Sequence, residues 1–181
     1  MNLKDVLESI ISEDKTLYSN EWLSIKQTDD WYVYMHQEKS DGKGVAVLGY
    51  RQIGEDVEFL GRFEQVPCHK DGAVLCSLTG MVERGDNPLE TAVKELVEES
   101  GIEKSSEYFE ELGTLRSSKA SDTTFFLFAV DLSDTEDKEV YEGDGDGTKG
   151  EEGSYCKWVS RQDVIQCKDP LLMALVMRAG I

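Results

Sequence analysis

The sequence contains no hydrophobic run of the roughly 18 residues that a membrane-spanning helix needs. It also begins without a basic stretch followed by an apolar one, which is the pattern of a secretory signal peptide. These two absences predict a cytoplasmic protein with no membrane partner. A content of 39% hydrophobic and 31% charged residues is typical of a globular chain rather than of a disordered one.

Lysine and arginine are scarce, since 19 of them stand against 37 aspartates and glutamates and the formal net charge is −18. Binding of DNA or RNA through a general surface needs clustered basic side chains, so this balance argues against a nucleic-acid partner. A solvated acidic surface is the simplest explanation of the excess. A second interpretation, which stays open at this point, is that some of the carboxylates bind metal ions. An enzyme this acidic would need such cations to act on an anionic phosphate substrate.

The four cysteines have no C-x-x-C pairing, and the two histidines have no zinc-finger spacing. The pattern therefore predicts neither a disulfide framework nor a structural zinc site. A G-x-x-x-x-G-K-[ST] phosphate loop is also missing, which argues against ATP-driven work. The cysteines are Cys68, Cys76, Cys156 and Cys167, and the histidines are His36 and His69.

The length of 181 residues suits one domain with a modest extension. We expect residues 1–43 to form the extension, with a helix over 2–13 and a hairpin made by 22–27 and 31–37. Residues 44–181 would form the main domain. Strands and helices interleave there, which predicts a layered α/β or α+β fold. The expected strands are 45–50, 58–66, 73–78, 110–116, 123–131 and 155–159, and the expected helices are 88–100 and 170–179, with a further helix start at 160–163.

Residues 88–100 carry the signals of a helix at both ends. Pro88 suits the first helical position, Asn87 can cap the helix, and Glu90 can complete a capping box. Gly101 suits the left-handed residue that ends a helix. Apolar residues recur at spacings of three and four, which predicts one buried face. These apolar residues are Leu89, Ala92, Val93, Leu96 and Val97.

The opposite face of this helix presents Glu95, Glu98 and Glu99, at positions i, i+3 and i+4. We expect their carboxylates to converge on one patch, where they repel by roughly a few tenths of a kcal/mol per pair. Hard cations such as Mg²⁺ and Mn²⁺ bind carboxylate oxygens, so the patch is a candidate metal site. For the three residues taken alone, the alternative is a solvated acidic helix face.

The segment from Gly80 to Ile102 resembles the Nudix signature, G-x5-E-x7-R-E-U-x-E-E-x-G-U, where U is a bulky aliphatic residue. Seven of its nine specified positions match in an intact register. The two departures are conservative, with Asp86 in place of the usual glutamate and Lys94 in place of the usual arginine. In the family the replaced residues help to hold the loop–helix–loop in shape. We therefore hypothesise that Asp86 and Lys94 form an ion pair.

The resemblance implies an α/β/α sandwich around a mixed sheet, and a metal-dependent hydrolase of nucleoside diphosphates linked to a further group. By similarity, Glu95, Glu98 and Glu99 would be catalytic residues that bind Mg²⁺ or Mn²⁺. The main-chain carbonyl of Thr79 would supply a further ligand. A water molecule would attack phosphorus while the metal neutralises the charge of the diphosphate.

The resemblance also implies residues outside the signature. Relatives use a further glutamate from a distant loop as a general base or metal ligand, and the candidates here are Glu151 and Glu152. Relatives place diphosphate-binding arginines on strands before the signature, where this chain has Arg51 and Arg62. For all four residues, a solvated side chain without a catalytic role is the alternative.

The order of elements resembles the ADP-ribose pyrophosphatase branch, which cleaves ADP-ribose or a nucleoside diphosphate sugar into a nucleoside monophosphate and a phosphorylated product. In that branch an N-terminal hairpin helps to build a homodimer, so residues 1–43 would be a dimerisation element. Cys76 stands where the branch often has a substrate-binding glutamate, which leaves the substrate open. The alternatives are a nucleoside triphosphate pyrophosphohydrolase that clears modified nucleotides, and a nucleotide-sensing domain without turnover.

Overall fold

A computed structural model describes residues 14–70, 72–116, 118–143 and 153–181 of the chain, so the helix expected over 2–13 lies outside the described residues. The first described element is a small antiparallel sheet made of β1 (Lys15–Ser19), β2 (Leu23–Gln27) and β3 (Val33–Gln37), in that order. Strands β2 and β3 confirm the predicted hairpin. The sequence pattern does not predict β1, because all five of its side chains are exposed and no apolar alternation marks it.

The larger sheet is built from the strands of the main domain. The expected strands are confirmed to within a few residues, except that the one expected over 73–78 is divided into two short strands with different partners. The observed strands are β4 (Lys43–Ile53), β5 (Asp56–Gln65), β6 (Ala73–Cys76), β7 (Leu78–Met81), β8 (Phe109–Arg116), β9 (Thr124–Asp131) and β10 (Tyr155–Ser160). Among the described residues the order is β10–β5–β4–β9–β8, with β6 beside β5 and β7 beside β4. Strands β4 and β9 run parallel and the other pairs are antiparallel, so the sheet is mixed.

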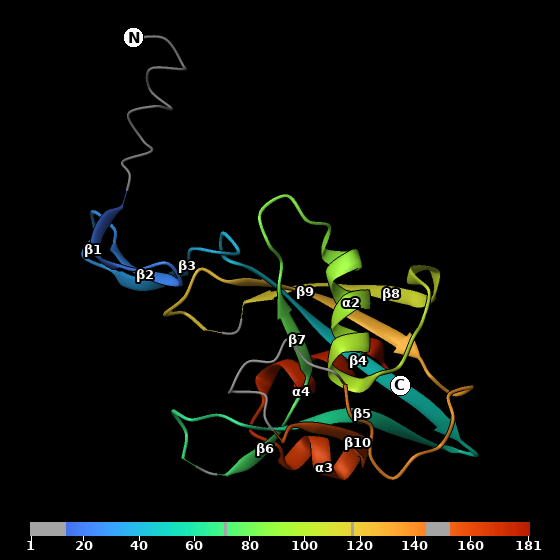
Figure 1. The fold of residues 1–181 in the computed structure, drawn as a ribbon. Helices are drawn as coiled ribbons and strands as arrows, with labels where there is room; N and C mark the ends of the chain where they lie inside the picture. Colours follow the sequence, from blue (N-terminus) through green and yellow to red (C-terminus); the bar gives the residue numbers. More distant parts are fainter. Residues whose placement is uncertain (1–13, 71, 117, 144–152) are drawn as a thin grey trace.

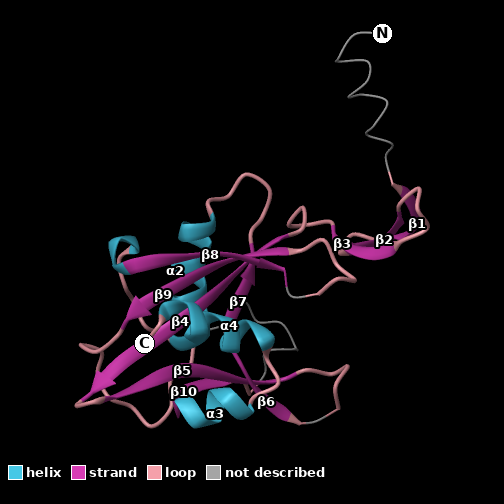
Figure 2. Ribbon diagram, turned by 180° about the vertical axis from the view of Figure 1, so that it is seen from behind, coloured by secondary structure: helices cyan, strands magenta, loops and turns pink. Residues whose placement is uncertain are grey.

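Helices cover both faces of this sheet. They are α2 (Pro88–Ser100), α3 (Arg161–Gln166) and α4 (Pro170–Ala179), with a short 3-10 turn, η1 (Ser106–Tyr108), after α2. Helix α2 lies over one face (Figure 1), and α3 and α4 lie over the other, as the view from behind shows (Figure 2). The predicted α/β/α sandwich around a mixed sheet is therefore confirmed. No helix in the described segments has the length and apolarity needed to cross a membrane.

Strand β4 is the centre of the core, because it is buried on both faces. Val45 and Val47 belong to the apolar cluster beneath α2, whereas Ala46 and Leu48 belong to the cluster beneath α3 and α4. All four side chains are 0% exposed. A strand that is covered on both faces has a continuous apolar run instead of alternation, which is how the sequence reads at this position.

Strand β4 changes partner along its length, and this change positions the candidate site. Its C-terminal half pairs with β5 and its N-terminal half pairs with β7, so β5 and β7 diverge from β4 near Leu48. The link between β6 and β7 is held at Ser77, whose N–H and Oγ–H both donate to Oδ2 of Asp169, at 2.7 and 2.8 Å. Asp169 also caps α4. Helix α2 contacts both of these diverging strands, β7 at Gly80 and β5 through the side chain of Arg62.

The small N-terminal sheet projects from one end of the larger one, as Figure 1 shows, and is attached through β3. The Met35 N–H donates to the Ala120 carbonyl at 2.8 Å, and Nδ1 of the buried His36 lies 2.8 Å from Oδ2 of Asp122. Both contacts reach the segment between β8 and β9. The division of the chain into an extension of 1–43 and a domain of 44–181 stays a prediction; β4 begins at Lys43.

Candidate active site

Helix α2 begins and ends as the sequence predicts. The side chain of Asn87 accepts a hydrogen bond from the first turn at 2.9 Å, and Gly101 ends the helix in the left-handed conformation, with φ at 68°. The prediction of a capping box with Glu90 is wrong, because the α2 start is capped by Asn87 alone. A capping box occurs instead at the start of α3, where Ser160 and Asp163 bond to each other reciprocally.

Glu95 lies directly against Gly80, the first residue of the signature. A Cβ atom placed on Gly80 would lie 1.8 Å from Oε1 and 2.0 Å from Cδ of Glu95. Gly80 belongs to β7, where it pairs with Val45 of β4. The Glu95 side chain therefore reaches from the helix to the sheet, and only a residue without a side chain leaves room for it.

Glu98 forms an ion pair one helical turn back, with its Oε1 at 3.1 Å from Nζ of Lys94. The hydrogen bond to Glu98 raises the pKa of Lys94, and the lysine side chain is 68% exposed. The hypothesis of an Asp86–Lys94 ion pair is wrong, since none is found in the described part of the chain. Glu98 lies on the same helix face as Lys94. Asp86 precedes the helix, and its N–H donates to the carbonyl of Glu83 in a turn.

Glu99 is buried, and its Oε1 forms an ion pair with Nη1 of Arg62, a residue of β5 that is also buried. The second carboxylate oxygen, Oε2, is buried and has no hydrogen-bond partner among the described residues. A buried carboxylate oxygen left in this way is unfavourable by roughly 1–3 kcal/mol or more. The fold therefore buries the Glu99 carboxylate, and the described residues provide a partner for only one of its two oxygens.

Glu64 and Ser154 also contact Arg62. Oε2 of Glu64 lies 3.4 Å from Nε of Arg62, and Nη2 of Arg62 donates to Oγ of Ser154 at 3.5 Å. The sequence singles out neither residue as functional. A signal existed for Glu64, because residues two apart on a strand share a face and Arg62 was already a candidate. For Ser154 the sequence offers none.

The three helix glutamates do not converge as expected. Among the described residues, no three histidine, cysteine, aspartate or glutamate side chains come close enough together to hold a metal ion. Glu98 turns toward Lys94 and Glu99 toward Arg62, which relieves the repulsion between like charges on one helix. The available donors are nevertheless carboxylate oxygens, with the buried Oε2 of Glu99 among them, and this set fits a hard divalent cation.

The carbonyl of Thr79 points away from β4. The Val82 N–H donates to the Lys43 carbonyl at 3.2 Å, and pairs in an antiparallel ladder alternate between bonded and non-bonded. Three residues earlier, the pair of Thr79 with Ala46 is therefore a non-bonded one. Its polar groups face the edge of β7 with which no described strand pairs. The Thr79 carbonyl is thus open to a ligand, as the family resemblance implies.

Two residues that the sequence does not single out, Gly143 and Cys156, pack behind the last turn of α2. A Cβ atom on Gly143 would lie 1.8 Å from the carbonyl oxygen of Glu98, and the Cys156 thiol donates to the carbonyl of Glu99 at 3.4 Å. Burial raises the pKa of the Cys156 thiol to about 12, so it stays a neutral donor. These contacts fix the turn that carries both glutamates.

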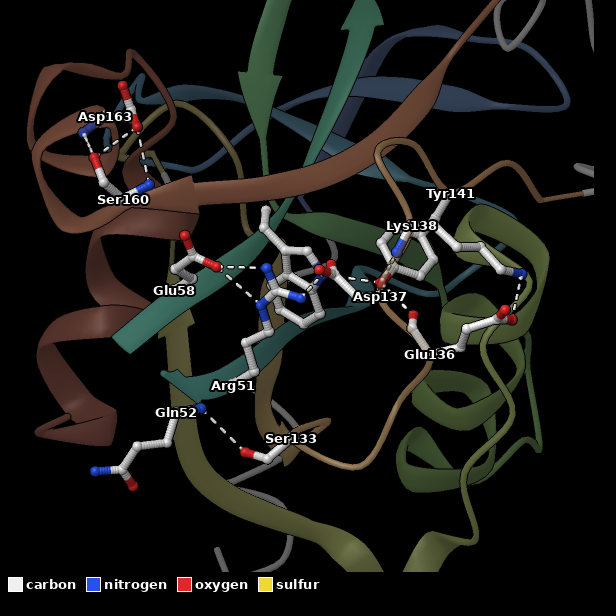
Figure 3. Close-up of polar contacts among 11 residues, drawn as sticks. Arg51, Gln52, Glu58, Ser133, Glu136, Asp137, Lys138, Tyr141, Ser160 and Asp163 are labelled. Atoms are coloured by element: carbon white, nitrogen blue, oxygen red, sulfur yellow. Dashed lines mark hydrogen bonds and ion pairs between the residues drawn. The ribbon is translucent and has the colours of Figure 1, made fainter. Parts of the chain in front are cut away.

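Arg51 lies in a different cluster from Arg62 (Figure 3). Its Nε and Nη2 donate to Oε2 of Glu58 at 2.8 and 2.7 Å, and its Nη1 donates to Oδ1 of Asp137 at 2.6 Å. The guanidinium also stacks on Trp158, whose indole N–H donates to the hydroxyl of Tyr141 at 2.9 Å. Burial acts to lower the pKa of Arg51, but the two carboxylates outweigh it and raise the pKa. A substrate phosphate would therefore compete with two carboxylates for the charge of Arg51.

Glu151 and Glu152, the candidates for the general base, lie outside the described residues. Gly143 before them and Ser154 after them are described, and both contact residues of the candidate active site. Gly143 packs on the backbone of α2, and Ser154 accepts a hydrogen bond from Arg62. Both candidates stay predictions.

Comparisons with known proteins agree with this geometry. A family model described as a NUDIX domain matches residues 42–176. A solved ADP compounds hydrolase is similar with a TM-score of 0.57 and 11% identity, over 93% of this chain and 90% of that one. A solved MutT/nudix family protein from Enterococcus faecalis has a TM-score of 0.47 and 15% identity, over 88% of this chain and 51% of that one, so this chain spans about half of its length. No curated protein matches the chain.

A mixed sheet between helices, with the signature glutamates on one of these helices, is the architecture that the resemblance to the Nudix family implies. The chain belongs to the Nudix family, since the family model covers most of its length. It is accordingly a Nudix hydrolase of nucleoside diphosphate derivatives, a class that generally works with divalent metal ions.

Proposed function

We propose that this Nudix enzyme cleaves the diphosphate linkage of ADP-ribose or of a nucleoside diphosphate sugar, and releases a nucleoside monophosphate and a phosphorylated second product. The observation that carries the proposal is the buried Oε2 of Glu99, which has no hydrogen-bond partner in the described chain. Glu95 and Glu98 lie on the same helix, within one turn of Glu99. An incompletely satisfied carboxylate beside two others suits a hard cation, Mg²⁺ or Mn²⁺.

The proposed metal ligands are Glu95, Glu98, Glu99 and the carbonyl of Thr79. A bound divalent cation neutralises the diphosphate and lowers the pKa of the attacking water. The chain contributes oxygens at fixed positions on one helix and one strand, and the absence of a side chain at Gly80 lets Glu95 reach the strand. Because these groups lie on a regular helix and strand, only side chains need to turn for the oxygens to meet at a metal.

The proposed general base is Glu151 or Glu152, which would take the proton of the attacking water. Its support is the placement of the described neighbours, Gly143 and Ser154, at α2 and Arg62. Replacing each glutamate with glutamine should lower kcat by about 10²-fold for the base and leave it near wild type for the other. Unchanged kcat in both variants and in the double variant would exclude this role.

The resemblance suggests two arginines for the diphosphate, Arg62 and Arg51, and we propose Arg62 as the main contact with Arg51 as the weaker candidate. Arg62 lies beside Glu99, where the reacting phosphates would lie. Arg51 is held by Glu58 and Asp137 in the other cluster. Arg62 is therefore the stronger proposal.

The function is tested by incubating the purified chain with ADP-ribose, nucleoside diphosphate sugars, dinucleotides and nucleoside triphosphates, with Mg²⁺ or Mn²⁺, and identifying the products. The proposal expects AMP and ribose 5-phosphate from ADP-ribose, or the matching pair from a nucleotide sugar. Preferred release of pyrophosphate from triphosphates would establish the triphosphate alternative. Saturable nucleotide binding without turnover would establish the sensing alternative. The similar ADP compounds hydrolase shares the fold at 11% identity, so its name guides the panel without deciding the result.

We propose further that the chain forms a homodimer through the small sheet β1–β3. Large apolar side chains are exposed there, and such patches mark interaction surfaces. They are Leu17, Tyr18, Trp22, Trp31, Tyr32 and Val33. Light scattering after gel filtration should give twice the chain mass for the wild type and a monomer for Tyr18→Ser combined with Trp31→Ser. The control is Met177→Ser on α4, where an equally exposed side chain lies outside the patch. A monomeric wild type would refute the dimer.

A further inference from the structure

The ion pair between Arg62 and Glu99 joins two side chains that are only 6% and 4% exposed. Removing two charges from water is unfavourable, and a buried pair recovers that free energy only when the remaining donors and acceptors are satisfied. Here Oε2 of Glu99 is not satisfied by any described residue. The pair is therefore a poor device for stabilising the fold, although it lies at the centre of the candidate site.

The surroundings of the pair carry an excess of negative charge. Arg62 faces both Glu99 and Glu64, and Lys94 pairs with Glu98 at the exposed edge of the helix. Glu95 adds a further carboxylate on the same helix face. A guanidinium at this position neutralises part of the excess and acts as the counter-charge of Glu99 inside the protein. A divalent cation that approaches Glu99 meets a positive charge already in place.

We propose that Arg62 is the internal counter-ion of Glu99 in the metal-free enzyme, and that a divalent cation competes with its guanidinium for this carboxylate. The proposal rests on the proposed function, because it takes Glu99 as a metal ligand. Arg62 holds Glu99 in position before the metal binds, and it releases the carboxylate wholly or in part when the metal arrives. It is thus a positioning residue, and it lowers the affinity of the site for metal.

The test measures binding of Mn²⁺, from the paramagnetic resonance signal of free Mn²⁺, together with the Tm of the metal-free and the Mn²⁺-saturated protein. In Arg62→Gln the competitor is absent, so Mn²⁺ should bind about tenfold more tightly than in the wild type. The metal-free Tm should fall, because a buried carboxylate has lost its counter-ion. Saturating Mn²⁺ should then raise the Tm by more than it does in the wild type, because metal replaces the missing charge.

Arg51→Gln is the matched control. It removes the same charge from the adjacent strand, where the arginine also faces two carboxylates, Glu58 and Asp137. This variant should lose Tm without a change in Mn²⁺ affinity, and Mn²⁺ should not recover the loss. A general effect of net charge would instead raise Mn²⁺ affinity equally in both variants, which would overturn the proposal.

Arg62→Lys keeps the charge but loses the planar group that faces Glu99 and Glu64 together, so its Mn²⁺ affinity should fall between wild type and Arg62→Gln. It also carries the test if Arg62→Gln does not fold without metal. Mn²⁺ affinity that is equal or weaker in the Arg62 variants overturns the competition. A wild type that binds no Mn²⁺ overturns the proposed function as well, whereas wild-type binding with unaltered Arg62 variants overturns only this inference.

Discussion

Gly80 and Glu95, fifteen positions apart in the sequence, are in direct contact in the fold: a Cβ atom on Gly80 would overlap the Glu95 carboxylate, 1.8 Å from Oε1. Gly80 lies in a regular strand, β7, so the site does not use its backbone freedom. It uses the space that the missing side chain leaves. The signature thus encodes a contact between strand and helix as well as a set of acids.

Replacing Gly80 with alanine should displace Glu95 and lower kcat/KM by about 10²-fold, because a shift of about 1 Å in a reacting constellation has an effect of this size. The inserted methyl should destabilise the fold by no more than about 1 kcal/mol, because it meets only the far end of the flexible, partly exposed Glu95 side chain. Steady-state kinetics and urea unfolding measure the two effects. The control is Met81→Ala at the adjacent, exposed position, which should change neither. Full activity in Gly80→Ala would show that Glu95 is not needed where it lies.

Replacing Glu98 with glutamine should abolish most metal-dependent turnover and leave stability within about 0.5 kcal/mol, because exposed ion pairs contribute little. Its partner Lys94 provides the control, since the lysine side chain is 68% exposed. Lys94→Gln breaks the same ion pair but keeps the carboxylate, so it should retain most of the turnover. Kinetics at several Mg²⁺ concentrations separate the cases. Equal losses in both variants would mean that the ion pair, and not metal ligation, is what Glu98 contributes.

The parts of the fold that the sequence predicts are those that local signals determine. Helix α2 was delimited by Pro88, the cap at Asn87 and the left-handed Gly101, and the structure confirms all three. Strand β4 was marked by its continuous apolar run. Burial follows from such patterns because the spacing of apolar side chains repeats with the geometry of the element itself.

The parts that the sequence does not predict depend on contacts between elements. Lys94 has acids within reach on its own helix and in the preceding loop, and only the fold shows that Glu98 is its partner. Gly143 stands in a glycine-rich stretch, and nothing local indicates that it packs on α2. Strand β1 has no buried face to mark it. The close contact of Arg62 with Glu99 likewise required the pairing of β5 and the placement of the helix above it.

Replacing Arg51 with glutamine should destabilise the protein by about 1–3 kcal/mol, because Glu58 and Asp137 lose their common cation and both are partly solvated. The KM for the substrate should stay within about twofold, since Glu58 and Asp137 already neutralise Arg51 and its side chain is only 14% exposed. Denaturant unfolding and substrate titration measure the two quantities. A KM raised by tenfold or more at an unchanged Tm would establish Arg51 as a substrate ligand.

Cysteine reactivity should report whether the back of α2 opens. Burial raises the pKa of the Cys76 and Cys156 thiols to about 12, and only the thiolate is reactive. At pH 8 about one thiol in ten thousand of each is ionised. Cys68 is exposed, so iodoacetamide should modify it first, as mass spectrometry would show, with Cys68→Ser as the control. Because the thiols ionise at lower pH when unfolded, their contribution to stability is complete below about pH 9 and falls as the pH rises toward 12. Prompt modification of Cys156 by iodoacetamide at pH 8 would contradict the expected order of modification. It would show that the contact of Cys156 with the Glu99 carbonyl opens in the native protein.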